Sequence, residues 1–322
     1  MKKFSLLLAA ILLCGLFASC TPVSEDESSS SSVSSTDSSD DLPAYEFTYN
    51  RYALPSDVEQ LLGSSLETYH SAVDAIDSVS DSFAVSDEAE AELLEQVLYA
   101  CYPPASLVTD MTYDASSKSV RLTYRYPAAV MEQRLPMLEQ LVVKIMGLTL
   151  REGDSEVVRA VALYKYVTTG VVDSGDDSKT VWNAFFDGEG DSAAMSAMCR
   201  FLFAQAGISS IPVTATDHEG NEHSLLAAEF GGMYYLIDPA YEAVRTSGQG
   251  LVCFGTTEQQ SNKENYLTDF AVSLPGLEMP SCTDERFASM RNCGKWSLNS
   301  TRDVISMTAD EYSGEFTDTA DR

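Results

Sequence analysis

Two adjacent glycines between two apolar runs constrain the fold of this 322-residue chain more than any other feature. Gly231 and Gly232 separate SLLAAEF, residues 224–230, from MYYLIDP, residues 233–239. Gly-Gly between two apolar runs is typical of a two-residue turn in a β-hairpin. The sequence therefore predicts an antiparallel pair of strands whose register is set by this turn.

This register places two titratable side chains on one face of the expected sheet. Leu225 lies opposite Asp238, and residues two apart along a strand point to the same side. His223 and Asp238 are therefore diagonal neighbours, with roughly 7–8 Å between their backbone positions. Their side chains can close that gap to a hydrogen bond, in which the carboxylate fixes the tautomer of the imidazole.

A helix that is apolar on nearly every side precedes these strands. It begins in DGEGDSAAMSAMCRF, residues 187–201, and Gly207 ends it. Such a helix is buried. If its N-terminus meets the face that carries His223 and Asp238, Ser192 lies beside His223, and the helix dipole there favours an anionic nucleophile or oxyanion. A nucleophile, a histidine and an aspartate in this order suit acyl transfer.

The order of these motifs resembles the bacterial transglutaminase-like domains, papain-like enzymes with a Cys-His-Asp triad. The resemblance covers about residues 153–260 and implies an α+β fold with a papain-like core, in which a buried helix packs on an antiparallel sheet. The preceding helix–hairpin–helix region is similar to the segment that often precedes this domain in exported bacterial proteins. The matching residues are Gly188 and Gly190, Ala193 to Ser196, His223, Tyr234-Tyr235 and Asp238-Pro239.

The chain departs from the family's pattern at the nucleophile and at two supporting positions. The family's cysteine falls on Ser192, its aromatic residue two after the histidine is Leu225, and its Tyr-Asp pair reads Val172-Asp173. A serine hydroxyl is far less acidic than a thiol, and a site shaped for sulfur places oxygen too far back. We therefore expect a catalytically degenerate domain that binds peptide or protein in its groove.

Other interpretations of the same residues stay open. In an active peptidase or amidase, Ser192 would be the nucleophile, His223 the base and Asp238 the orienting acid. Ser192 is also a good helix N-cap, which would stabilise the helix without any chemistry. A purely structural envelope domain is a third option. We expect Cys199 to be a buried helix residue, His218 to be a solvated turn residue, and no metal or cofactor to be required.

The N-terminus predicts export and a lipid anchor. Lys2 and Lys3 precede an apolar run, residues 6–17, that is too short to span a bilayer comfortably. The run ends in Phe-Ala-Ser-Cys at residues 17–20, which resembles a bacterial lipobox. We expect residues 1–19 to be a signal peptide and Cys20 to carry a lipid that anchors the exported protein to the bacterial cell membrane.

The stretch after Cys20 and the overall charge limit what this chain can bind. Residues 20–42 are rich in serine and acidic residues, and such a segment buries too little apolar surface to fold, so it predicts a disordered linker. The formal charge of the chain is −29. A surface this acidic repels nucleic acid, so we expect a peptide or protein ligand and no nucleic-acid partner.

The remaining chain is expected to form two regions and a tail. Residues 43–150 predict a helix–hairpin–helix region, with the hairpin at about 106–127 and a helix at 129–148. Residues 151–305 correspond to the transglutaminase-like domain, and residues 306–322 to a polar tail with little structure. Cys282 and Cys293 flank a short segment of an exported chain, which predicts a disulfide that would stabilise the fold by ~3 kcal/mol.

Overall fold

The computed structural model describes residues 42–174, 179–309 and 312–318. The predicted signal peptide, Cys20 and all but the last residue of the predicted linker lie outside these residues. No helix within the described ranges combines the length and the apolar character that crossing a membrane requires.

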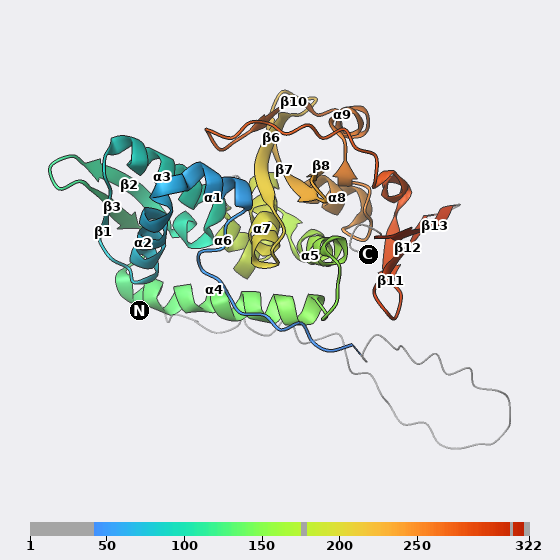
Figure 1. Cartoon of the computed structure of the whole chain (residues 1–322), viewed down its shortest axis with the longest axis horizontal. Coiled ribbons are helices and arrows are strands. Elements are labelled where there is room, and N and C mark those ends of the chain that lie inside the picture. The colour runs from blue at the N-terminus through green and yellow to red at the C-terminus, as the bar shows by residue number, and fades with distance from the viewer. Residues whose placement is uncertain (1–41, 175–178, 310–311, 319–322) are drawn as a thin grey trace, which may run out of the picture. The chain divides into compact units, whose positions relative to one another are not determined.

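The first part of the described chain combines helices with a small antiparallel sheet of strand order β1–β3–β2 (Figure 1). The predicted hairpin and the long helix after it are both confirmed, as β2–β3 and α4. The elements are α1 (Ser56–Leu62), η2 (Gly63–Ser65), α2 (Leu66–Asp77), β1 (Ser82–Ala84), α3 (Glu88–Cys101), η3 (Pro103–Leu107), β2 (Val108–Asp114), β3 (Ser119–Tyr124) and α4 (Ala128–Thr149).

The second part is organised around a five-stranded antiparallel sheet of order β10–β6–β7–β8–β9. The elements from α4 to this sheet's last strand are α5 (Glu156–Gly170), β4 (Val172–Asp173), α6 (Val181–Phe186), β5 (Glu189–Gly190), α7 (Ser192–Gln205), β6 (Ser210–Thr216), β7 (Glu222–Phe230), β8 (Met233–Ile237), α8 (Pro239–Thr246), β9 (Phe254–Thr256), α9 (Glu258–Asn265) and β10 (Thr268–Val272).

The Gly-Gly turn joins β7 and β8 in the predicted register. Gly231 and Gly232 have φ of 61° and 81°, in the left-handed region that glycine enters without steric cost. The ladder pairs Phe230 with Met233 and Ala227 with Leu236. The register prediction is therefore confirmed, and with it the placement of residues 223 and 238 at the same end of the sheet.

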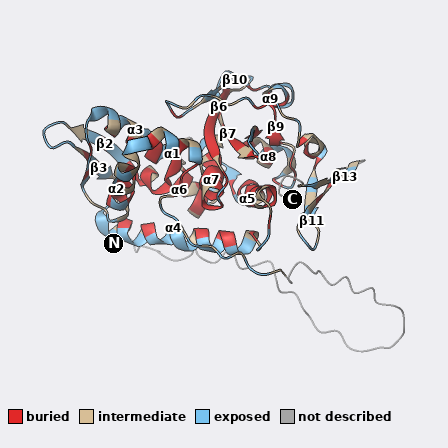
Figure 2. Cartoon of the chain, viewed as in Figure 1, coloured by how far each residue is buried: buried red, intermediate tan, exposed pale blue. Residues whose placement is uncertain are grey.

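Helix α7 lies in the middle of the largest hydrophobic cluster and packs against β7 (Figure 2, where it is red). Met195, Phe201 and Phe203 point to different sides of the helix and are all buried, which confirms that α7 is buried nearly all round. The same cluster includes Met131 on α4 and Met307 near the C-terminus. The core of the described chain thus runs across the boundary at residue 150 that the sequence suggests.

The predicted unstructured C-terminal tail is wrong for its first part. After η4 (Ala288–Asn292), a three-stranded antiparallel sheet of order β11–β12–β13 is formed by β11 (Lys295–Leu298), β12 (Val304–Ala309) and β13 (Tyr312–Thr317). Ile305 and Met307, two apart on β12, are buried in the main cluster, and the ring of Phe316 contacts that of Phe287 at 5.4 Å. Ile305 and Met307 alternate with Ser306 and Thr308, which is the pattern of a half-buried strand, and the polar composition of the segment outweighs that pattern in the prediction.

The predicted disulfide is also wrong, because all five cysteines within the described ranges are free. Cys282 and Cys293 belong to two hydrophobic clusters that lie on opposite sides of the five-stranded sheet. Cys282 Sγ lies 3.7 Å from the carbonyl oxygen of Pro280, and Cys293 Sγ lies 3.2 Å from that of Lys295. The short spacing between the two cysteines does not bring them together, because each sulfur is buried among different apolar neighbours.

Candidate active site at the start of helix α7

The loop before α7 is held by a short pair of parallel strands. Val172 N–H donates to the carbonyl oxygen of Gly188 at 2.9 Å, and β4 pairs with β5 residue by residue. A Cβ atom added at Gly190 would lie 2.8 Å from the Cβ of Ala194, which is closer than side chains approach one another. The glycine therefore permits the close contact between the loop and the first turn of α7.

The helix cap at this position is Asp191, one residue before the predicted candidate. The carboxylate of Asp191 accepts the backbone N–H of Ala194 at 2.7 Å, as an N-cap side chain does. Ser192 is the first residue of α7 and is half-buried. Helix capping is thus carried out by Asp191, and the hydroxyl of Ser192 has another partner.

Two serines, one helical turn apart, join α7 to the backbone of β7. Ser192 Oγ accepts a hydrogen bond from the backbone N–H of Ser224 at 3.1 Å. Ser196 Oγ donates to the carbonyl oxygen of Leu225 at 2.9 Å and is buried. These bonds place the start of α7 directly against the residue that follows His223.

His223 and Asp238 form the hydrogen bond that the hairpin register predicts. His223 Nε2 lies 2.8 Å from Asp238 Oδ2, and both residues are buried. The other carboxylate oxygen, Oδ1, accepts the backbone N–H of Tyr241 at 3.0 Å and caps α8. The carboxylate of Asp238 therefore both orients the imidazole and caps α8. The position of the ring is thus tied to the backbone of that helix.

Tyr241 and Tyr164, which were not predicted from the sequence, hold this pair in place through a ring contact and a hydrogen bond. The ring of Tyr241 stacks on the imidazole, with centroids 4.2 Å apart and an interplanar angle of 13°. Tyr164 OH donates to the backbone carbonyl of Asp238 at 3.0 Å and also contacts the fully buried carboxylate of Glu242 at 3.1 Å. The Asp-Pro motif that opens α8 is the only sequence signal for this support.

The charge of His223 is favoured by its surroundings. Burial lowers the pKa of the imidazole, but the attraction and hydrogen bond of Asp238, with further attraction from Asp217 and Asp173, outweigh it. The pKa of His223 is therefore raised above its ordinary value of about 6.5. A raised pKa leaves a smaller fraction of neutral imidazole at neutral pH.

Ser192 and His223 meet at the start of β7 without a direct hydrogen bond. Within the described part of the chain, the imidazole bonds to Asp238 and the Ser192 hydroxyl bonds to Ser224. Nδ1, the ring nitrogen that faces away from Asp238, has no hydrogen-bond partner in that part of the chain. The geometry orients the histidine as a catalytic triad does, while the serine hydroxyl is bound to the backbone next to it.

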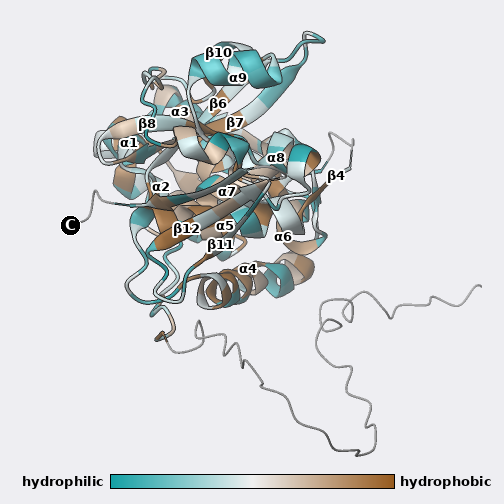
Figure 3. Ribbon diagram, turned by 90° about the vertical axis from the view of Figure 1, so that its right-hand side faces the viewer, coloured by the Kyte–Doolittle hydropathy of each residue, from teal (hydrophilic) through white to brown (hydrophobic). Residues whose placement is uncertain are grey.

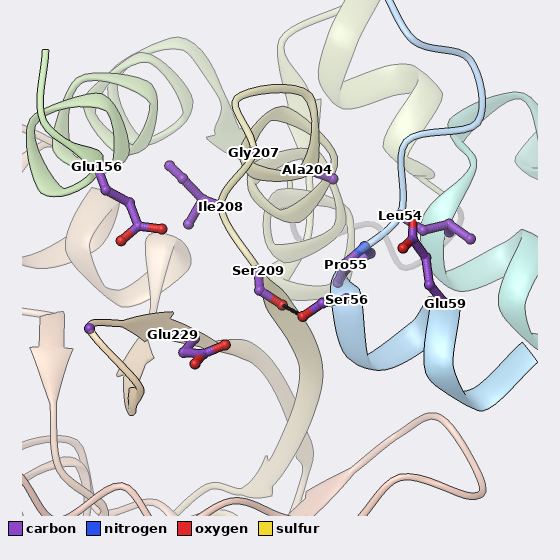
Figure 4. A pocket seen from close by; sticks show the side chains of 11 residues that line it. Leu54, Pro55, Ser56, Glu59, Glu156, Ala204, Gly207, Ile208, Ser209 and Glu229 are labelled. Carbon is purple, nitrogen blue, oxygen red and sulfur yellow. Dashed lines mark hydrogen bonds between the residues drawn. The ribbon is translucent and has the colours of Figure 1, made fainter. Parts of the chain in front are cut away.

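Two clear cavities lie away from this cluster. One, of about 380 Å³, is shown in Figure 4; the hydroxyls of Ser56 and Ser209 bond across it at 3.0 Å. Another, of about 350 Å³, is formed at α6. Neither cavity includes Ser192, His223 or Asp238, so both cavities are separate from the candidate site.

The alternative nucleophile and metal ligands do not join the site. Cys199 is completely buried, and burial raises the pKa of its thiol far above the ordinary value. His218 is exposed beside Glu219, with 3.8 Å between His218 Nε2 and Glu219 Oε1. Among the described residues, no three histidine, cysteine, aspartate or glutamate side chains gather closely enough to hold a metal ion.

Comparisons with known proteins give partial likenesses only. No protein-family model matches the chain. No curated protein matches it either. A structure from Cytophaga hutchinsonii, named as a candidate cysteine protease, is similar over 33% of this chain and 37% of its own length, with 14% identity and a TM-score of 0.28. LapG of Legionella pneumophila is similar over 36% of this chain and 67% of its own, with 12% identity and a TM-score of 0.25. Because the TM-scores and identities are low, these likenesses say nothing of the chemistry of the site.

Proposed function

We propose that this protein binds a peptide or protein at the start of α7 without chemical turnover. The observation that carries the proposal is a serine hydroxyl at the start of α7 that makes no hydrogen bond with His223 among the described residues. A serine nucleophile needs a neutral imidazole to take its proton during attack. Ser192 Oγ instead accepts a bond from the β7 backbone and, within the described part of the chain, makes none with the imidazole, while the pKa of His223 is raised.

The retained His223–Asp238 pair fits a thiol better than a hydroxyl. A charged imidazole beside a helix N-terminus stabilises a thiolate, which is the form that attacks in cysteine enzymes. A serine hydroxyl has a much higher pKa and gains little from the same surroundings. The arrangement therefore supports a degenerate transglutaminase-like site in which Ser192 stands where a cysteine would act.

The surface around His223 supports a ligand in extended contact with the protein. Val172 on β4 is 68% exposed next to the loop that leads to α7, and Tyr241 on α8 is partly exposed above the imidazole. Asp217 and Asp173 add negative charge near His223. A peptide with an apolar side chain and a basic or neutral neighbour matches this surface.

A test of this function starts with covalent labelling. The mature chain is incubated with a fluorophosphonate probe, beside a serine hydrolase of known reactivity and beside the Ser192→Ala variant. We expect no adduct on Ser192. Binding is then measured with an immobilised peptide library, comparing the wild type with Ser192→Trp, which places an indole over the site. Binding that survives Ser192→Trp unchanged would place the ligand elsewhere.

The second candidate function is an active acyl-transfer enzyme. The observation in its favour is the intact bond of 2.8 Å between His223 Nε2 and Asp238 Oδ2, next to a helix N-terminus. Ser192 Oγ would keep accepting the Ser224 N–H and donate its own proton to His223. A fluorophosphonate adduct on Ser192, lost in His223→Gln, would establish this function and reject the binding protein.

We also propose that the protein is exported and held on the cell membrane by a lipid on Cys20. The support is the sequence alone: a positive start, a short apolar run and Cys20 at the end of a lipobox-like segment. Metabolic labelling with an alkyne fatty acid tests it. We expect labelling of the wild type, none of Cys20→Ala, and release of that variant from the membrane fraction.

A further inference from the structure

A cavity of about 350 Å³ between the end of β3, helix α4 and helix α6 has a composition unusual for this chain. Arg125 and Tyr126, just after β3, form one wall, and Arg134 from α4 joins them. The opposite wall belongs to α6 and the residue that ends it, Asp187. The cavity thus gathers two guanidinium groups in a protein with 20 basic and 49 acidic residues.

Neither arginine has an acidic partner within the described part of the chain. No ion pair or side-chain hydrogen bond there involves Arg125 or Arg134, although acidic residues are more than twice as frequent as basic ones. Arg134 instead lies over the ring of Tyr126, with 4.4 Å from Cζ to the ring centroid. Stacking of this kind holds a guanidinium plane while leaving its edge N–H groups to bind an anion.

The opposite wall is aromatic. Trp182 and Phe186, one turn apart on α6, stack with centroids 4.5 Å apart and an interplanar angle of 28°. The side chain of Met137, which also lines the cavity, is 47% exposed. A large apolar side chain left open beside aromatic rings suits an apolar ligand group.

We propose that this cavity binds one carboxylate carried on an aromatic or apolar group. The guanidinium groups of Arg125 and Arg134 would take the carboxylate, and the wall of Trp182, Phe186 and Met137 would take the apolar part. Asp187 also lines the cavity, where its carboxylate accepts the side-chain N–H of Asn183 at 2.8 Å. The two guanidinium groups and the one carboxylate leave a net charge of +1, which a single ligand carboxylate neutralises.

The source of such a group is either the C-terminus of a peptide or a free aromatic acid. Both present the same chemistry to the cavity, a single carboxylate next to an apolar group. The inference does not rest on the function proposed for Ser192, because none of the residues of that cluster lines this cavity.

Isothermal titration calorimetry tests the site with paired probes. The first pair is 3-phenylpropionate and its neutral amide; the second is Ala-Ala-Phe with a free or an amidated C-terminus. We expect saturable binding of at least one free acid, and binding at least tenfold weaker for its amide. Preference for the peptide acid identifies a C-terminus as the ligand, and preference for phenylpropionate identifies a small acid.

Variants and a fluorescent reporter complete the experiment. Arg125→Gln with Arg134→Gln should lower the affinity at least tenfold, whereas Arg121→Gln, exposed on β3 and outside the cavity, should leave it unchanged. The chain has two tryptophans, so Trp296→Phe leaves Trp182 as the reporter of occupancy. Equal affinity for acid and amide, no binding of any probe at about 5 mM, or an unchanged affinity in the double variant would overturn the proposal.

Discussion

The hydroxyl of Ser192 accepts a hydrogen bond from the backbone N–H of Ser224, the residue that follows His223 on β7, at 3.1 Å. This bond brings the start of α7 against the buried His223–Asp238 pair while leaving Ser192 and His223 without a direct bond. The site keeps the parts that lower the pKa of a thiol, and it carries a hydroxyl. Its behaviour is therefore best tested by restoring the sulfur.

Ser192→Cys should create a thiol more acidic than an ordinary cysteine, whose pKa is about 8.5. The imidazolium form of His223, which Asp238 favours, and the N-terminus of α7 both stabilise a thiolate there. The rate of iodoacetamide labelling against pH measures the pKa of the new thiol. The fully buried Cys199 should stay unlabelled and serve as the internal control. Adding His223→Asn should return the pKa to the ordinary range; a titration at or above 8.5 in the single variant would refute the geometry.

Asp238→Asn should destabilise the fold in a pH-dependent manner. The raised pKa of His223 means that its protonated form stabilises the folded state below the unfolded pKa of about 6.5, and that this stabilisation is lost as pH rises through the folded pKa. Asn remains a good N-cap for α8, so the helix start is retained. We expect a loss of about 1.5–3 kcal/mol at pH 5–6 and a smaller loss at pH 9.

Urea unfolding of the wild type and of Asp238→Asn at several pH values measures this difference in the free energy of unfolding. Nuclear magnetic resonance of the His223 ring gives its pKa directly, which should fall in the variant. A gap in stability that is the same from pH 5 to pH 9 would show that His223 does not titrate against Asp238.

Gly190→Ala should destabilise the protein by about 1–3 kcal/mol. The added Cβ would lie 2.8 Å from the Cβ of Ala194 and 3.6 Å from both Ala184 Cβ and Val171 Cγ1, and the loop cannot move away without breaking the β4–β5 pair. Gly147→Ala in α4 is the matched control, because nothing lies within 4 Å of its added Cβ and alanine favours a helix. The midpoint temperature of thermal unfolding should be equal to or higher than that of the wild type in Gly147→Ala, and lower in Gly190→Ala.

The hairpin and the buried helix could be predicted from the sequence because each is set by local patterns. Gly231 and Gly232 fix the turn, the turn fixes the register, and the register brings His223 to Asp238. The largely apolar stretch after Ser192 likewise identifies α7 as a core helix. These features follow from the period of side chains along a strand and a helix, and they need no knowledge of distant contacts.

The supporting residues could not be predicted, because they depend on contacts between distant segments. Tyr164 on α5 reaches Asp238 across 74 positions of sequence, and Glu242 accepts hydrogen bonds from three separate segments. α9 is polar along its length, teal in Figure 3, and shows no apolar stripe from which a helix could be inferred. The disulfide prediction used spacing alone, and spacing does not say in which cluster each sulfur is buried.

The five cysteines in the described ranges should all titrate as free thiols after unfolding without a reductant. Burial raises the pKa of Cys282 to about 12 and that of Cys293 to about 11, so both should react slowly in the folded protein. Counting thiols with and without urea measures this in a chain that lacks residues 1–41. Mass spectrometry of a non-reduced digest is the control, and a peptide that links residues 282 and 293 would contradict the structure.

Glu242→Ala should be among the most destabilising single substitutions near the site. The carboxylate of Glu242 is fully buried and accepts Cys253 N–H at 2.7 Å, Thr246 Oγ1 at 2.6 Å and Tyr164 OH at 3.1 Å. Alanine leaves a cavity and an unpaired Cys253 N–H, at a cost of roughly 2–5 kcal/mol, while Tyr164 OH and Thr246 Oγ1 keep backbone acceptors. Glu242→Gln keeps one acceptor and the volume, so its loss should be smaller.

The loss of stability in Glu242→Gln should depend on pH if the carboxyl of Glu242 titrates differently in the folded and the unfolded protein. Burial raises the pKa of Glu242, against the lowering effect of Thr246, Cys253 and Tyr164. Because the pKa is higher in the folded state, the protonated carboxyl stabilises the fold at pH values below the unfolded pKa of about 4.3. This stabilisation is lost as pH rises through the folded pKa. Glutamine does not titrate, and His223 is present in both proteins. The free energy of unfolding of the wild type should therefore exceed that of Glu242→Gln most at pH 4.5 and least at pH 8. Urea unfolding of both proteins gives this difference, and a constant difference would show that the carboxyl is not held away from water.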